Sequence, residues 1–196
     1  MTDTDRFFSV FFDYIRELVN IPVGDQAICR KYFTPMRVEK NTILEKAGQV
    51  HHHHIFIVSG YMRSYHLDEK GNEVVIDLNS GPRFFTSYHH FIKRTPSNEF
   101  LHCITDCELL RITRDDMETT AKLGETQLEY SMLILESSLE KRKQRSIDLS
   151  TLSAEERYRK LLKNHPTIIQ NIPLIYIASY LGINPGSLSR IRKKLD

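Results

Sequence analysis

The feature that most constrains this sequence is its last stretch, LIYIASYLGINPGSLSRIRKKLD, in which two helix-like segments meet at Gly182. Apolar residues recur at helical spacing in both segments. They are Leu174, Ile177, Ala178 and Leu181 before the glycine, and Leu188, Ile191 and Leu195 after it. Ala178 is small where two crossing helices would touch, Gly182 can take the positive φ of a tight turn, and Ile183 can point back into the core. The stretch therefore predicts a helix-turn-helix whose second helix begins near Pro185.

The apolar side of that second helix also predicts which residues face outward. If Leu188, Ile191 and Leu195 are inside, the opposite stripe holds Gly186, Ser189, Arg190 and Lys193. Arginine can bond guanine through two hydrogen bonds, serine can bond a base edge or a phosphate, and lysine suits phosphates. We therefore expect a DNA-reading helix with Arg190 as the principal base contact. The candidate DNA-binding residues are Ser187, Ser189, Arg190, Arg192, Lys193 and Lys194. For the last three, the alternative is ordinary solvated charge.

Charge is distributed unevenly along the 196 residues, although the formal net charge is only +2. From Leu139 to Asp196 there are 12 Lys or Arg and 5 Asp or Glu, whereas the preceding 138 residues hold 15 and 20. A basic segment beside an acidic body is typical of nucleic-acid binding, and a solvated helical surface gives the same count.

The middle of the chain has a different pattern, that of short strands separated by turns. Two amphipathic helices are expected first, over residues 4–19 and in DQAICRKYF. From about Thr34, β-branched and aromatic residues dominate. The expected strands are NTILEKAG, IFIVSGYMRSYHL, NEVVIDL, EFLHCI and ELLRI, with a hairpin turn at DEKGN. This pattern favours a β-barrel or jelly-roll over an α/β sheet.

A long helix without Pro or Gly is expected from about Thr126 to Ile147, and it carries an apolar stripe. The stripe consists of Leu128, Met132, Leu135 and Leu139. Two heptads are fewer than the three or four that identify a coiled coil, so two interpretations remain open. The stripe forms a dimer seam, or it packs against the chain's own barrel.

The remaining totals exclude several classes of protein. No run approaches the roughly 18 apolar residues of a membrane span, and the N-terminus lacks the basic start of a secretory signal, so a cytoplasmic protein is expected. Cys29, Cys103 and Cys107 are odd in number and show no CxxC spacing. Neither a disulfide framework nor a structural zinc site is indicated, and buried free thiols are expected.

This order of parts, with the motifs IVSG, DEKGNEV and IASYLGINPGSLSRIRKKL, resembles the Crp/Fnr family of transcription regulators from about Phe33 to Asp196. The resemblance implies an α+β protein in three parts. Residues 1–125 would be a cyclic-nucleotide-binding-like jelly-roll sensor with flanking helices, 126–148 a dimerisation helix, and 149–196 an all-α helix-turn-helix domain. It further implies a non-enzymatic bacterial homodimer that binds two-fold related half-sites in double-stranded DNA, with RNA polymerase as a further partner. Pro185 and Gly186 replace the polar residues usual at the start of the recognition helix.

The sensory part departs from the family members that bind cyclic nucleotides. Their phosphate-binding cassette has a Gly-Glu pair for the ribose and an Arg-Ser or Arg-Thr pair for the phosphate. In GPRFFTSYHHFIKRTPSNEFLH no Glu or Arg occupies those places, because the candidate pocket residues are Thr86, Ser87, Ser97 and Asn98. A buried phosphate without a cationic partner is poorly compensated, so cyclic AMP is not the expected effector. The pocket would hold an unknown small molecule or none. The neighbouring Arg83, Lys93 and Arg94 either substitute for the missing arginine or lie on the surface.

No metal site and no enzyme active site can be assigned. His51 to His54 form a run expected to be an exposed polar loop, and no third ligand accompanies an alternate pair. A metal-dependent cupin is disfavoured because no Glu follows His52 and His54 at the required spacing. Another interpretation is an effector-binding or protein-interaction module whose degenerate helix-turn-helix does not read DNA. The sequence stops at Asp196 without the β-hairpin wing of the wider family, so weak and salt-sensitive DNA binding is expected.

Overall fold

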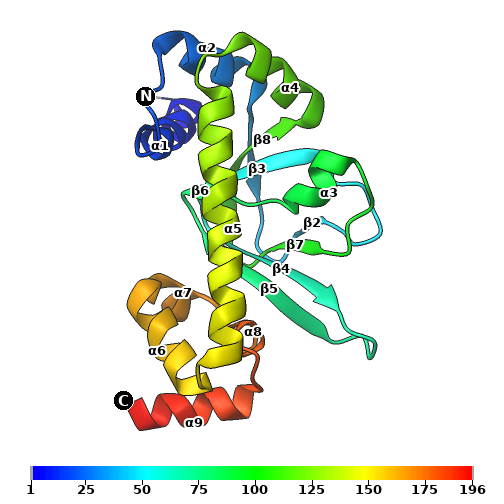
Figure 1. The fold of residues 1–196 in the computed structure, drawn as a ribbon, viewed down its shortest axis with the longest axis vertical. Coiled ribbons are helices and arrows are strands. Elements are labelled where there is room, and N and C mark those ends of the chain that lie inside the picture. The colour runs from blue at the N-terminus through cyan, green and yellow to red at the C-terminus, as the bar shows by residue number, and fades with distance from the viewer. Residues whose placement is uncertain (1, 196) are drawn as a thin grey trace.

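A computed structural model describes residues 2–195 of the chain and has three parts stacked along one axis (Figure 1). The helices are α1 (Asp3–Arg16), α2 (Val23–Tyr32), α3 (Tyr88–Lys93), α4 (Arg114–Leu123), α5 (Gln127–Thr151), α6 (Ala154–Asn164), α7 (Pro166–Asn171), α8 (Leu174–Tyr180) and α9 (Pro185–Leu195). The strands are β1 (Thr34–Val38), β2 (Ile43–Glu45), β3 (His53–Ser59), β4 (Tyr61–Leu67), β5 (Glu73–Ser80), β6 (Arg83–Phe84), β7 (Phe100–Cys103) and β8 (Cys107–Thr113). The α+β fold predicted from the sequence is confirmed.

The strands form two four-stranded sheets whose paired strands run antiparallel. One sheet has the order β1-β8-β3-β6 and the other β2-β7-β4-β5. Residues such as Ile57, Met62, Leu101 and Leu109 are completely buried in the core that the two sheets share. This arrangement is the predicted jelly-roll. The hairpin predicted at DEKGN joins β4 and β5, with Gly71 at a φ of 79°.

The segment IFIVSGYMRSYHL is two strands rather than one, because the chain turns at Gly60. Gly60 has a φ of 102°, and a Cβ there would lie 2.6 Å from the carbonyl oxygen of Asp106. Only glycine fits this close approach of two backbones.

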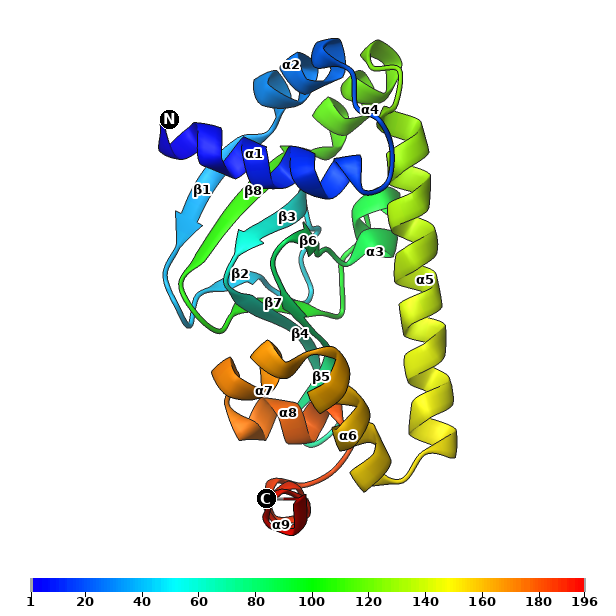
Figure 2. The ribbon, with the colours of Figure 1, turned by 90° about the vertical axis from the view of Figure 1, so that its left-hand side faces the viewer.

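Helix α1 lies across the outer face of one sheet (Figure 2). A capping box between Thr2 and Asp5 begins it, and its phenylalanines enter a core shared with β3, β6, β8 and α5. The amphipathic helix expected over residues 4–19 is present: Phe8, Phe11, Phe12 and Ile15 are buried, whereas Leu18 lies beyond the helix end and packs at the edge of this core.

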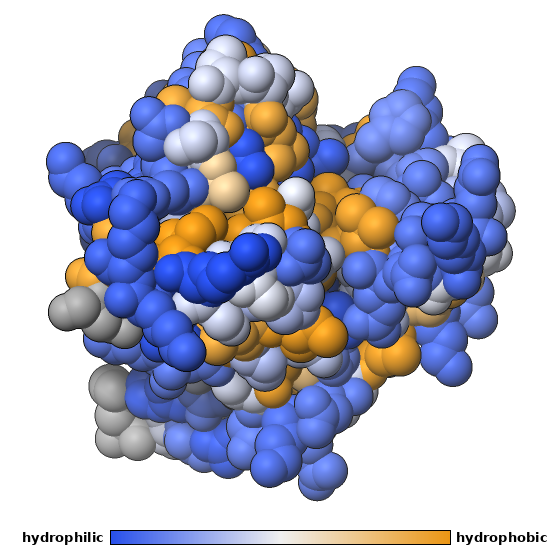
Figure 3. Space-filling model, turned by 90° about the horizontal axis from the view of Figure 1, so that it is seen from below, coloured by the Kyte–Doolittle hydropathy of each residue, from blue (hydrophilic) through white to orange (hydrophobic). Residues whose placement is uncertain are grey.

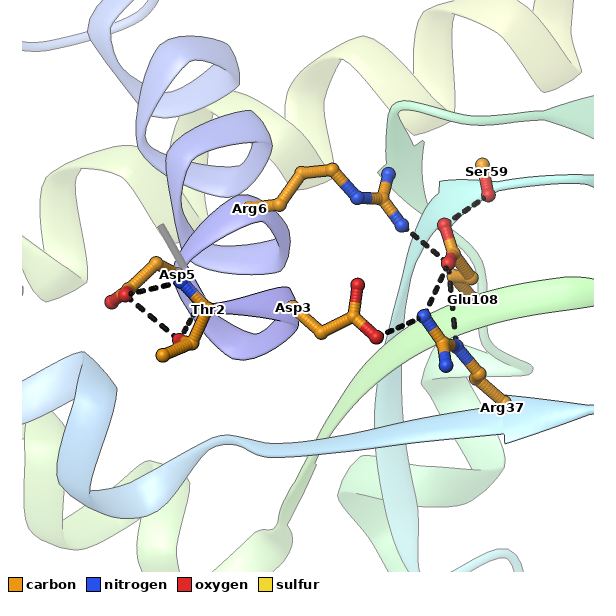
Figure 4. A network of polar contacts seen from close by, with 7 residues as sticks. All are labelled: Thr2, Asp3, Asp5, Arg6, Arg37, Ser59 and Glu108. Atoms are coloured by element: carbon orange, nitrogen blue, oxygen red, sulfur yellow. Dashed lines mark hydrogen bonds and ion pairs between the residues drawn. The ribbon is translucent and has the colours of Figure 1, made fainter.

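A polar network fixes the same helix from its other side. Arg6 of α1 and Arg37 of β1 both converge on the carboxylate of Glu108, which also accepts a hydrogen bond of 2.7 Å from the Ser59 hydroxyl (Figure 4). Burial raises the pKa of Glu108, whereas the hydrogen bonds and charges of Arg6, Ser59 and Arg37 lower it. The lowering effects are together larger, so the pKa of Glu108 lies below its usual range. The N-terminal helix is thereby tied to the sheet.

Helix α5 runs down the length of the molecule and connects the upper part to α6–α9 (Figure 2). It ends at Thr151, four residues beyond the expected end at Ile147. The C-terminal helices share one core with the β4–β5 hairpin, in which Tyr65, Val75 and Leu78 pack beside Ile177 and Leu188. Among residues 2–195, no helix is both long enough and apolar enough to cross a membrane.

Candidate nucleic-acid interface and sensor pocket

The predicted helix-turn-helix is present, and its turn has the expected chemistry. Gly182 has a φ of 69°, and the amide of Ile183 donates to the carbonyl of Ala178 at 3.0 Å, which closes the end of α8. Asn184 begins the next helix, because its side-chain oxygen accepts the amide of Ser187 at 2.8 Å. Ala178 is completely buried, as its small size predicts. Local sequence signals therefore end α8 and begin α9.

Helix α9 has one buried and one exposed side. Leu188 is completely buried, and Ile191 and Leu195 pack against the same core, as predicted. The residues on the opposite stripe, Gly186, Ser189, Arg190 and Lys193, are exposed together with Lys194. Ser187 and Arg192 are partly buried at the edge. The helix thus presents most of the candidate DNA-binding residues on one accessible face.

Contacts within the chain already engage some of these side chains. Arg190 donates to the Ser187 hydroxyl at 3.3 Å, and the Ser189 hydroxyl donates to the carbonyl of Pro185 at 3.0 Å. Lys194 forms an ion pair of 2.8 Å with Glu155 of α6. These exposed contacts are weak in water, so each side chain can exchange its partner for a phosphate or a base at small cost. At this end of the molecule, hydrophilic residues surround a central gathering of hydrophobic ones (Figure 3).

Helix α5, like α9, has one buried and one exposed side. Tyr130 and Ile134 are buried against the roll, whereas Leu128, Met132 and Leu139 are 62%, 70% and 60% exposed. Leu135 lies between the two sides and lines a groove that runs along α5, between the roll and the C-terminal helices. The chain's own barrel therefore does not cover the apolar stripe.

The cassette region folds into β6 and the short helix α3, neither of which was predicted. Thr86 and Ser87 are buried and line the groove, but Ser97 and Asn98 are not among its lining residues. The Thr86 hydroxyl accepts the amide of Ile55 at 3.0 Å, and Ser97 donates to Ser87 at 3.3 Å. Asn98 is exposed. The hydroxyl groups in the expected pocket are therefore bonded to the protein itself.

The expectation that the histidine run is an exposed loop is wrong for three of its four members, because His51 is buried and His53 and His54 belong to β3. His51 is buried and lies 2.8 Å from a carboxylate oxygen of Glu45. His54 is buried in β3, with its ring stacked on Phe84 at a centroid distance of 4.5 Å. Burial lowers the pKa of His54 to about 3, so the ring is neutral. His52 alone is fully exposed, and tertiary partners that are distant in sequence explain the difference.

The three cysteines are free and buried, which confirms the prediction. Burial raises the pKa of the Cys29 thiol to about 11. Over the described range 2–195, no three His, Cys, Asp or Glu side chains are grouped so that they could hold a metal ion.

A contact that was not predicted joins the roll to α8. Arg63 of β4 is buried, and its guanidinium lies 3.7 Å from the ring centroid of Tyr176 and 4.2 Å from that of Tyr65. Its Nε donates to Nδ1 of His102 at 2.9 Å, and its Nη1 lies 2.7 Å from Glu73. Burial, and then the charge of Arg63, lower the pKa of His102, which keeps the accepting ring neutral. Part of this contact could have been predicted from the sequence, because Arg63 and Tyr65 are two residues apart in a strand and so share one face of it.

A groove of about 930 Å³ runs along α5, between the roll and the C-terminal helices. Its lining includes Thr86 and Ser87 of the cassette and the basic residues Arg83, Lys141 and His165. Arg94, one of the three suggested substitutes for the cassette arginine, instead pairs with Asp115. Lys93 lines the groove but is exposed.

Comparisons with known proteins agree with this architecture. Residues 35–122 match the family model of the cyclic nucleotide-binding domain. The structure of FixK2 from Bradyrhizobium japonicum is 18% identical, with a TM-score of 0.70 over 83% of this chain and 84% of that chain. The c-di-GMP responsive regulator CLP from Xanthomonas campestris is 18% identical, with a TM-score of 0.65 over 89% and 91%. A Crp/Fnr-family protein from Eubacterium rectale is 15% identical, with a TM-score of 0.69 over 96% and 86%. No curated protein sequence matches the chain.

Proposed function

We propose that this chain, which carries a cyclic nucleotide-binding domain within the fold of the Crp/Fnr regulators, is a transcription regulator that binds DNA as a homodimer and is not an enzyme. The exposed basic face of α9, opposite the buried Leu188, carries the proposal. A helix held by its apolar side, with Arg190 and Lys193 outward, suits insertion into a major groove. Arg190 reads a base, while Lys193 and Lys194 contact phosphates.

The apolar stripe on α5 supports the proposed dimerisation. Three large side chains, Leu128, Met132 and Leu139, are more than half exposed, and their spacings of four and seven residues are those of a helix seam. A second copy of the same helix is complementary to this stripe and would place two α9 helices on two-fold related half-sites.

Cyclic AMP is not the proposed effector. The positions at which cyclic-nucleotide binders hold a Glu and an Arg carry hydroxyl residues, and Thr86 and Ser97 already bond protein groups. A cyclic phosphate there would lose its hydration without gaining a cationic partner.

The DNA-binding proposal is tested by selecting preferred sequences from random duplexes with the full-length protein. Binding of a selected site is then measured by fluorescence anisotropy at several salt concentrations. Arg190→Ala should weaken binding by roughly 5–150-fold, which corresponds to about 1–3 kcal/mol for one bidentate base contact. Lys122→Ala, which removes an exposed charge on α4, is the matched control and should leave affinity unchanged. If no sequence is selected and Arg190→Ala binds as the parent does, the helix-turn-helix contacts protein instead.

Dimerisation is tested separately by light scattering. Leu139→Glu should yield a monomer at micromolar concentration, because it places a charge in the apolar seam. Leu123→Glu changes a similarly exposed leucine on α4, 56% accessible, and should remain dimeric. A parent chain that is monomeric at micromolar concentration would remove the basis for the seam.

A further inference from the structure

The groove gathers basic side chains from three parts of the molecule. Arg83 belongs to β6 of the roll, Lys141 and Arg145 to α5, and His165 to the junction of α6 and α7. Each of the four lines the groove. Residues so distant in sequence meet because α5 passes between the sensor and the C-terminal helices.

These cations are not neutralised within the part of the chain that is described. Over residues 2–195, Arg83 and Lys141 have no ion pair and no side-chain hydrogen bond, and Nε of Arg83 is buried without an acceptor. Arg145 donates through Nη2 to the carbonyls of Val75 and Tyr180, but its Nε is likewise buried and unbonded. Native proteins usually satisfy such buried donors, so the two nitrogens indicate an absent acceptor.

Nearby carboxylates do not compensate the charge. Asp77 of β5 faces the cluster but forms no ion pair closer than 4.0 Å among the described residues, and Asp148 is already bound to Lys160 at 2.6 Å. Burial lowers the pKa of Lys141, and the positive charge of Arg83 lowers it further. The pKa of His165 is lowered by burial and, to a smaller extent, by the positive charges of Arg83 and Lys141. The charge of Asp77 opposes these shifts only in part, since the pKa values of both groups stay below their usual range.

We propose that the groove binds the phosphate group of a phosphorylated small molecule among Arg83, Lys141 and Arg145. Guanidinium groups match the oxygens of a phosphate in geometry and charge, and lysine adds a point charge. The groove volume of about 930 Å³ lies within the range of small-molecule sites. Leu135, Ile168 and Tyr180 supply apolar lining for an organic portion. The contacts differ from those of the cassette, because Lys141 and Arg145 belong to α5 and Arg83 stands three residues before Thr86.

Such a ligand would touch the sensor, the long helix and the C-terminal helices at once. It would therefore influence how α8 and α9 are held relative to the roll, provided that it binds one arrangement better than another. This inference does not depend on DNA recognition by α9, since the phosphate site contains no residue of that helix.

The test is calorimetric titration of the full-length protein, without DNA, using inorganic pyrophosphate, orthophosphate and ATP as probes. We expect pyrophosphate to bind, and Arg83→Gln and Lys141→Gln each to weaken it about tenfold or more, as loss of one charge-assisted contact implies. Lys143→Gln is the matched control, because Lys143 is two residues along the same helix and is exposed like Lys141, but does not line the groove. Arg83→Lys retains the charge and should recover part of the affinity.

The probes also distinguish the source of the phosphate. Tighter binding of ATP than of pyrophosphate assigns the apolar lining to an organic portion, and equal binding of orthophosphate assigns the site to the free ion. The site is overturned if pyrophosphate fails to bind, or if Lys143→Gln weakens binding as much as Lys141→Gln. Thermal unfolding of each variant shows whether it is folded. Because DNA is absent, failure here leaves the α9 proposal standing, and a failed DNA selection leaves this result unaffected.

Discussion

Replacing Arg63 by methionine should weaken the attachment of α8 to the roll. Methionine retains an unbranched apolar stem but loses the guanidinium, which contacts Tyr176 at 3.7 Å and His102 at 2.9 Å. The hydrogen bond to His102 contributes about 0.5–1.5 kcal/mol, and a desolvated cation–π contact about 2 kcal/mol. The ion pair with Glu73 adds at most about 1 kcal/mol, because Glu73 is 43% exposed and rehydrates when its partner is removed. We expect a loss of about 2.5–4.5 kcal/mol in the free energy of unfolding.

Urea denaturation followed by far-UV circular dichroism measures that loss. Arg16→Met removes an exposed arginine paired only with Asp13 and should change stability by less than about 0.5 kcal/mol. A double-mutant cycle between Arg63→Met and Tyr176→Leu isolates the contact between the two parts, with an expected coupling of about 1 kcal/mol. Equal effects of Arg63→Met and Arg16→Met, or a coupling near zero, would refute the reasoning that this arginine joins roll and helix.

Three other outcomes follow from single groups. Gly182→Ala should destabilise the protein by about 1–2 kcal/mol, because its φ of 69° is costly for a residue with a Cβ, whereas Gly24→Ala, with free space around its Cβ, should be neutral or stabilising in thermal melts. The pKa of His54 is about 3 in the folded state and about 6.5 in the unfolded state, so its contribution to stability is complete above pH 6.5. As the pH falls from 6.5 toward 3, the free energy of unfolding should fall by about 1.4 kcal/mol per pH unit. His54→Phe should remove this dependence, which is measured as the urea midpoint at each pH. Cys29, whose pKa is about 11, should react with a disulfide reagent at pH 8 only after unfolding.

Local rules made the helix-turn-helix predictable. Its positions depend on helical spacing, on the positive φ of Gly182 and on a small residue at Ala178, all of which can be read within a few neighbours. The jelly-roll was predictable for the same reason, because alternating strands and turn residues determine hairpins such as β4–β5.

The histidines and the cassette could not be predicted in this way. Whether a histidine is buried depends on what lies opposite, and Phe84 is thirty residues from His54 in sequence. The same holds for Ser97, whose hydroxyl turns toward Ser87 and the amide of Glu99 instead of toward the groove. Long-range packing decides these positions, and periodicity carries no information about it.

Arg145 connects the groove to the docking of α8, and its hydrogen bonds determine the sign of any coupling. One nitrogen, Nη2, bonds the carbonyls of both Val75 and Tyr180, and Nε remains free. An anion on Nε would therefore add a contact without breaking either bond, so it should stabilise the docked arrangement of α8. At a hundredfold excess over Kd, linkage allows about 2.7 kcal/mol of stabilisation. Saturating pyrophosphate should accordingly slow hydrogen exchange at the amides of Ile177 and Leu181. Faster exchange would mean that the anion competes with the Val75 and Tyr180 carbonyls for the guanidinium.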